Sequence, residues 1–82
     1  MADVKVAPGS YTFVQFFGLV DFDFEGAAYV EDDGAPRVDY RKVKVGGLSF
    51  DDLDQTFVVP ESADVVEVTV DGEVVKSASV GA

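Results

Sequence analysis

The chain has 82 residues, and 16 acidic residues against 6 basic ones give it a formal net charge of -10 at pH 7. A single β-domain covering residues 1–82 suits this length, because a chain of this size buries only about 60 to 65% of the surface that it exposes when unfolded. Since the chain has no Cys and no His, it has no disulfide, none of the usual zinc ligands and no general base that titrates near pH 7. We therefore expect no enzyme, no catalytic residues, no cofactor and no small-molecule substrate.

The amino-acid usage is biased in a way that suggests a source. The sequence holds 17 Val but no Ile and no Asn, and 11 Asp but only 4 Lys. This choice resembles that of proteins encoded by GC-rich genomes, and the pI of about 4.1 resembles that of proteins from salt-loving archaea. In molar salt the Debye length falls to about 3 Å, so that repulsion between carboxylates is screened. Halophily is the favoured interpretation, and an acidic protein of a GC-rich bacterium or its phage is the alternative.

No segment has the pattern of a signal peptide or of a membrane-spanning helix. The first five residues lack both a basic region and an apolar region. The longest nearly apolar run, over residues 13–20, has eight residues, far fewer than the roughly 20 that span a bilayer. We expect a protein of the cytoplasm, or of an assembly built there, without a membrane partner.

Val, Phe, Tyr and Thr dominate and apolar residues alternate with polar ones, which predicts an all-β fold. We expect a small antiparallel sandwich or barrel-like domain of about six to seven strands. In chain order, the predicted elements are an edge strand over 4–7, a long strand over 11–25 that bends at Gly18, a strand over 27–31, a turn over 32–36, a strand over 37–45, a capped helical turn over 49–53, a strand over 57–59 and a C-terminal hairpin.

The predicted long strand has two apolar faces in its first half. Its even positions should face the core: Val14, Phe16, Val20, Phe22 and Phe24. Its odd positions form a second apolar set: Tyr11, Phe13, Phe17 and Leu19. Because side chains alternate across a strand, the two sets cannot share one core. A second sheet of the same chain or a neighbouring chain must cover the odd set. We favour a neighbouring chain, which makes these four residues a predicted apolar interface.

The C-terminal hairpin has the clearest signal. Asp71-Gly72 between two alternating runs predicts a two-residue type I′ turn, because both central residues need positive φ. A regular register then places Val68 opposite Val75 and Glu67 opposite Lys76, with Val66, Val68 and Val75 facing the core.

Acidic clusters do not predict a metal site. Asp21, Asp23, Glu25 and Gly26 match the start of a calcium-binding EF-hand loop, but its twelfth position would be Asp32 instead of Glu, and no helices are expected to flank it. A solvated strand face explains these residues better. A second cluster, Asp51, Asp52 and Asp54, is interpreted as a hydrated loop.

Four of the six basic residues lie within eight positions and form a predicted basic strip: Arg37, Arg41, Lys42 and Lys44. The net charge opposes the approach of nucleic acid phosphates, and salt that screens this charge would weaken phosphate contacts too. We therefore expect the basic strip to contact an acidic protein neighbour. A solvated strand face is the equally weighted alternative.

Together these features predict a non-enzymatic structural protein that acts through protein-protein contacts. The favoured function is a virion component (capsid decoration, minor capsid or tail protein) of a tailed virus infecting a halophilic archaeon or another GC-rich host. Its partners would be copies of itself or a larger shell or tail protein, and it would be assembled in the host cytoplasm. The alternative is a cytoplasmic protein-binding or regulatory homo-oligomer of a halophile. A small nucleic-acid-binding β-barrel ranks third.

Overall fold

The computed structural model describes residues 4–81, and strands dominate it. The elements are β1 (Val4–Val6), β2 (Gly9–Thr12), α1 (Phe13–Leu19), α2 (Phe24–Ala28), β3 (Tyr29–Asp32), β4 (Ala35–Val38), the 3-10 turn η1 (Tyr40–Lys42), β5 (Val43–Val45), β6 (Thr56–Val59), β7 (Val65–Val70) and β8 (Glu73–Val80). The predicted small β-rich fold is confirmed. The described residues hold eight strands instead of six or seven, and they include short helices that were not expected.

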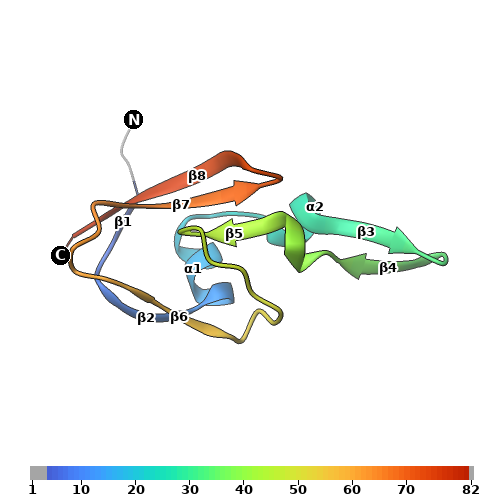
Figure 1. Cartoon of the computed structure of the whole chain (residues 1–82), viewed down its shortest axis with the longest axis horizontal. Helices are drawn as coiled ribbons and strands as arrows, with labels where there is room; N and C mark the ends of the chain where they lie inside the picture. Colours follow the sequence, from blue (N-terminus) through green and yellow to red (C-terminus); the bar gives the residue numbers. More distant parts are fainter. Residues whose placement is uncertain (1–3, 82) are drawn as a thin grey trace.

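The strands form one four-stranded sheet in the order β1-β8-β7-β5 and two pairs, β2-β6 and β3-β4. Figure 1 shows β7 and β8 on one side of the body and β2 and β6 on the other. Every pair is antiparallel except β1 with β8, where Val4 lies opposite Ala78 in parallel register. The prediction of a purely antiparallel sheet is wrong at this edge. The two strands come from opposite ends of the described chain, so no tight hairpin forces them to run in opposite directions.

The core is aromatic and surrounds α1. Phe13 of α1 stacks on Phe50 and Phe57 with ring centroids 4.1 and 4.7 Å apart, and Phe17 stacks on Phe24 at 5.1 Å. Valines of β1, β5, β6 and β7 belong to the same buried cluster. Apolar burial, the dominant favourable term in folding, is therefore concentrated where α1 meets the sheets.

The predicted long strand over 11–25 is wrong, because the strand ends at Thr12 and α1 begins. Thr12 and Gln15 form a capping box: Thr12 Oγ1 accepts from the Gln15 N–H at 3.1 Å, and Gln15 Oε1 accepts from the Thr12 N–H at 2.9 Å. These bonds satisfy two of the backbone N–H groups that a helix start leaves without an intrahelical partner. They stabilise a helix in a segment that β propensity alone assigns to a strand.

The helix changes which side chains face the core. Phe13, Phe16, Phe17 and Val20 are all buried, because their i, i+3, i+4, i+7 spacing puts them on one helix face. Val14, which was predicted to face the core, is exposed on the other face. The even and odd sets of the predicted strand therefore do not exist as two faces.

The C-terminal turn is confirmed, with φ of 53° at Asp71 and 85° at Gly72. Beyond the first two pairs, the predicted register is wrong, since Val68 lies opposite Lys76 and Glu67 opposite Ser77 across a β-bulge. The extra residue, Val75, is exposed instead of buried.

The bulge places Lys76 opposite Val68 and improves the apolar match at Val66. The regular register would bring Ser77 opposite Val66 on the core face. The bulge instead brings Ala78 opposite Val66, and Ala78 is buried. One inserted residue thus exchanges a hydroxyl that would need a buried partner for an apolar side chain.

The predicted strand over 37–45 is interrupted. Asp39 caps η1 by accepting from the Arg41 N–H at 3.1 Å, and the strand direction resumes only at Val43. The helical turn predicted over 49–53 is also absent, although Leu53 packs against the core as expected.

Candidate protein-interaction site

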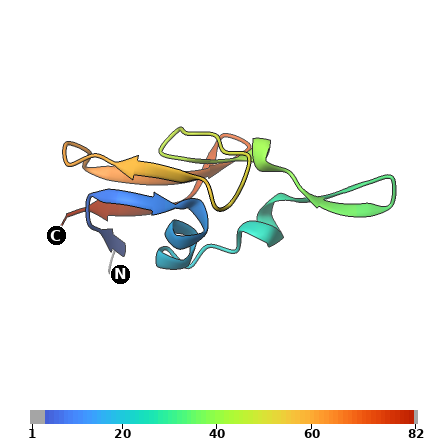
Figure 2. The ribbon, with the colours of Figure 1, turned by 90° about the horizontal axis from the view of Figure 1, so that it is seen from below.

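The β3-β4 hairpin, residues 29–38, projects from the body and is called the arm below. In the two perpendicular views of Figures 1 and 2, the arm projects from one end of the body along the long axis of the molecule. The molecule measures 45 by 27 by 19 Å along its principal axes. Within residues 4–81, β3 and β4 pair only with each other, around a turn in which Asp33 and Gly34 have positive φ. A two-stranded hairpin is marginally stable at best by itself in water.

The root of the arm is fixed to the core. The Asp39 N–H donates to the Ala28 carbonyl oxygen at 2.7 Å, which closes the base of the hairpin. The next residue, Tyr40, packs on Phe24 and Phe50 at centroid distances of 5.7 and 5.4 Å. The position of the arm is thus defined at its root.

An ion pair reinforces this root. Arg41 donates from Nε to Asp39 Oδ1 at 2.9 Å and from Nη2 to Asp39 Oδ2 at 3.2 Å. Hydrogen bonding to Arg41 lowers the pKa of the Asp39 carboxyl group, and the same contact raises the pKa of Arg41. The Asp39 side chain is 10% exposed and that of Arg41 is 91% exposed. Arg41 therefore already has an acidic partner within its own chain.

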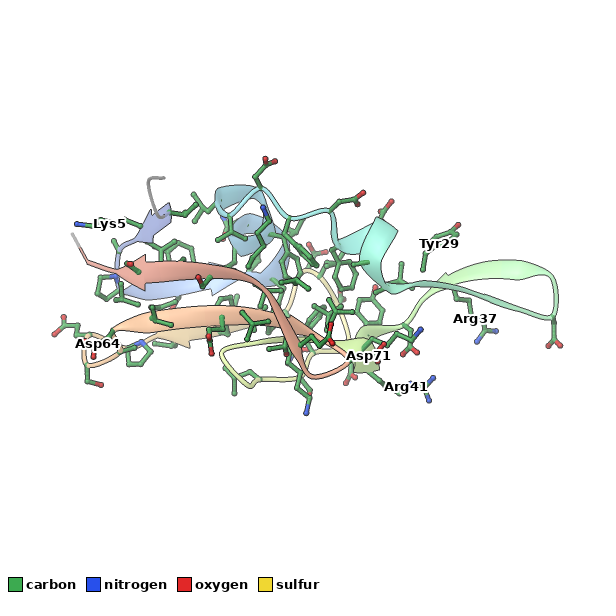
Figure 3. The ribbon with its side chains drawn as sticks, turned by 90° about the horizontal axis from the view of Figure 1, so that it is seen from above. Lys5, Tyr29, Arg37, Arg41, Asp64 and Asp71 are labelled. Atoms are coloured by element: carbon green, nitrogen blue, oxygen red, sulfur yellow. The ribbon has the colours of Figure 1, made fainter. Side chains whose placement is uncertain are left out.

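The predicted basic strip does not lie on one strand. Arg37 is exposed on β4, Arg41 and Lys42 belong to η1, and Lys44 is exposed on β5, opposite Thr69 of β7. Figure 3 shows Arg37 on the arm and Arg41 at its root. The four basic residues therefore lie on three different elements, one on the arm and three in the segment that joins the arm to the body.

The predicted apolar interface is largely internal. Phe13 and Phe17 are 1% and 4% exposed, so this chain itself covers them. The ring of Tyr11 is half-buried over Phe57, and its hydroxyl donates to the Ala7 carbonyl oxygen at 2.6 Å. Of the four residues, only Leu19 is an exposed large apolar side chain. The expectation that a neighbour must cover Phe13 and Phe17 is corrected, since it depended on a strand that α1 replaces.

The structure also shows an apolar groove that the sequence analysis missed. It has a volume of about 280 Å³, and its walls include Leu48, Phe57, Val58, Pro60, Ala63 and Val65. Sites for small organic ligands usually measure roughly 300–1,000 Å³ and carry a few polar groups. This groove lies at the lower limit of that range, and its lining residues are all apolar or Gly. Such a groove suits one or two apolar side chains of a protein.

A signal for the groove was present in the sequence. Val58-Val59 and Val65-Val66 are pairs of adjacent apolar residues in strands that have one face in the core. Since neighbours on a strand point to opposite faces, one member of each pair must lie on the outer face. Val58 is 62% exposed, and Val65 is exposed as well.

An unpaired strand edge borders the groove. Within residues 4–81, β6 pairs only with β2. The Phe13 N–H donates to the Gln55 carbonyl oxygen at 3.1 Å, and hydrogen-bonded pairs recur every second residue in an antiparallel ladder. In this phase, Thr56 and Val58 direct their N–H and C=O groups away from β2. The free edge of β6 can therefore accept another strand.

The acidic clusters have local structural roles. Asp23 caps α2 by accepting from the Gly26 N–H at 2.9 Å, so the predicted strand face here is wrong. In the second cluster, Asp52 accepts from the Asp54 N–H at 2.9 Å. Among the described residues, no three or more acidic side chains gather closely enough to suggest a metal site.

Comparisons with protein-family models, with curated proteins and with solved structures find no match for this chain. Between residues 4 and 81, no helix has both the length and the apolar character that a membrane-spanning helix needs.

Proposed function

We propose that this chain is a non-enzymatic structural protein that acts by binding other protein chains. The arm is the observation that carries the proposal. It extends from the body, is fixed at its root by Asp39 and Tyr40, and pairs with no other strand in the described residues. Natural proteins usually cover or blunt exposed strand edges, because such edges bind other strands. A partner chain would give this arm the contacts that the body does not provide.

The groove supports the same function from the other side of the interaction. It offers apolar walls beside the free edge of β6. We propose that the four-stranded sheet and the β2-β6 pair form a sandwich or barrel-like domain that is open along the β6 edge, where a strand from a partner would continue it.

We propose further that the assembly is the virion of a tailed virus infecting a halophilic archaeon or another GC-rich host. In this role the chain is a capsid decoration, minor capsid or tail protein. The acidic excess and the use of Val without Ile or Asn support this source. An arm that is fixed at its root and projects from a small body suits a subunit that is held in place by its neighbours. The groove also favours a second candidate function, a cytoplasmic homo-oligomer of a halophile, because one chain carries both an arm and a groove.

The test is to find where the chain resides. Particles released by cells that encode it are purified on a density gradient, and the chain is quantified by mass spectrometry in the particles and in the cytosol. A virion component should be present in the particles at a copy number comparable to that of other structural subunits. Detection only in the cytosol, as a small oligomer, would refute the virion function and support the second candidate.

A further inference from the structure

We propose that the partner of the arm is a second copy of this chain, and that the β3 edge of one copy pairs with the β6 edge of the next, with Tyr29 in the apolar groove. This inference rests on the proposed function of protein binding and names its partner and its two surfaces. The argument comes from strand edges, from exposed apolar side chains and from the distribution of charge.

The two edges match in length and phase. β3 and β6 have four residues each. The bond from the Asp39 N–H to the Ala28 carbonyl oxygen makes Tyr29 and Val38 a non-hydrogen-bonded pair. Tyr29 and Glu31 therefore direct their backbone groups away from β4. Tyr29 and Glu31 are two residues apart, as Thr56 and Val58 are on β6. Each edge therefore has two residues whose free N–H and C=O groups have the spacing of a regular antiparallel ladder.

The outer edge of β4 is the weaker candidate. In the same ladder, Pro36 and Val38 are the β4 residues whose backbone groups point away from β3. Proline has no N–H, which is why it is found on strand edges that do not pair. A partner strand would lose a hydrogen bond at Pro36 but none on the β3 edge.

Tyr29 is the large side chain that β3 offers. It is 53% exposed, although it begins a strand whose root is packed on the core. The groove beside β6 has exposed Leu48, Val58 and Val65 along it and a volume of about 280 Å³. Pairing of the two edges would bring an exposed aromatic ring to exposed aliphatic side chains.

Charge favours this orientation over other contacts between copies. With a net charge of -10, two copies repel each other over most of their surfaces. Residues 29–45, which span the arm, η1 and β5, hold four basic and four acidic residues, so this part of the chain is neutral and the remainder carries the whole net charge of -10. The acidic residues Glu61 and Asp64 are exposed in the loop that supplies Pro60 and Ala63 to the groove. Figure 3 shows Asp64 at the end of the molecule opposite Arg37. A contact made through the neutral arm and its root therefore meets less repulsion than a contact between two acidic parts of the body.

Such a contact is heterologous, since it joins different surfaces of identical chains. Heterologous contacts produce a ring where the rotation closes and a filament where it does not. The wild-type chain should therefore form species larger than a dimer.

Two variants test the two surfaces. Native mass is measured in molar KCl by light scattering for the wild type, Tyr29→Ser on the arm and Val58→Pro on the β6 edge. The Val58 N–H points away from β2, so proline removes an edge donor without breaking the β2-β6 ladder. Each variant should dissociate to monomers of 8.7 kDa, with affinity at least tenfold weaker. The control is Leu19→Ser, at an exposed apolar residue of α1 that lies on neither surface. This control should assemble like the wild type, and circular dichroism should show all variants folded.

A mixture decides whether the contact is head-to-tail. Tyr29→Ser keeps an intact groove and Val58→Pro keeps an intact arm, so mixing the two should produce a one-to-one dimer and nothing larger. A mixture that stays monomeric, or a Tyr29→Ser chain that assembles like the wild type, would overturn the pairing of arm and groove. A wild-type chain that is monomeric up to its solubility limit would overturn self-association. The proposed function would still stand in that case if the chain is found in particles.

Discussion

Replacing Phe17 with Ala should destabilise the chain itself. The Phe17 ring lies 5.1 Å from that of Phe24, 5.5 Å from Phe22 and 5.8 Å from Phe50, centroid to centroid. Removing a buried Phe side chain costs about 3–5 kcal/mol of the free energy of unfolding. At 0.05–0.15 kcal/mol per residue, a domain of this size has about 4–12 kcal/mol in all. The variant should therefore lose from a quarter of its stability to all of it.

The matched control is Leu19→Ala in the same helix. Leu19 is 49% exposed, and Ala is the best helix former. Replacing Leu19 with Ala should therefore lower the free energy of unfolding by less than about 1 kcal/mol. Thermal unfolding followed by circular dichroism in constant KCl should show the difference directly. A loss of 3–5 kcal/mol corresponds to a fall in Tm of about 12 to 40 °C for a domain of this size.

The opposite result would refute this account of the core. If Phe17→Ala unfolds within 1 kcal/mol of the wild type, Phe17 does not belong to the packed interior of the chain. If the two variants lose equal stability, α1 does not present one buried face and one exposed face. A change in native mass without a change in unfolding would restore the interpretation that a neighbour covers Phe17.

Three further predictions concern the cap, the arm root and the charge. Thr12→Ala should cost about 1 kcal/mol of unfolding free energy because it removes the capping bond to the Gln15 N–H; Thr12→Ser should keep most of it, and equal urea midpoints for the two variants would contradict the cap. Arg41→Gln should raise the lowered pKa of Asp39 toward the ordinary value of 3.8, as measured by NMR titration. Because the pKa of Asp39 is lowered by folding, its stabilisation is complete above that ordinary value and is lost as the pH falls through the lowered pKa; an Asp39 titration unaffected by Arg41→Gln would contradict the ion pair. Molar KCl should raise the unfolding midpoint by screening 16 carboxylates, and a flat or falling midpoint would count against halophily.

The sequence predicted the parts of the fold that depend on local turn chemistry. Asp71-Gly72 required positive φ, and the turn forms there. The strand ending before Pro60 and the strand near residue 4 are also present. The turn and the end of β6 depend on one or two residues, Asp71-Gly72 and Pro60, whose backbone preferences hold in almost any context.

The elements that were mispredicted depend on competition between patterns. Over residues 13–20 the same phenylalanines fit an alternating strand and a helix, and the segment is too short for period alone to decide. The pair Thr12 and Gln15 was the deciding signal, and it was overlooked. The bulge at Val75 could not be predicted from the hairpin alone, because it depends on which residue of β8 meets the core.

The candidate site was predicted only in part. The cluster of basic residues was visible, but its division between β4, η1 and β5 follows from the cap at Asp39. The groove depends on β6 and the start of β7 lying together, a contact that is not local in sequence. Val58 and Val65 break the alternation of apolar and polar residues, which predicts that each is an exposed apolar side chain. The alternation pattern does not show that the two side chains line the same groove.

The parallel pairing of β1 with β8 sets a time order for folding during synthesis. Val4 lies opposite Ala78, which is more than seventy residues further along the chain. Within its sheet β1 pairs only with β8, so β1 has no strand neighbour until β8 has left the ribosome. Until then its edge is available to other chains, including those being made on the same messenger. Contacts of such sequence separation slow folding. The nascent chain therefore has an interval in which cotranslational association competes with completion of the sheet.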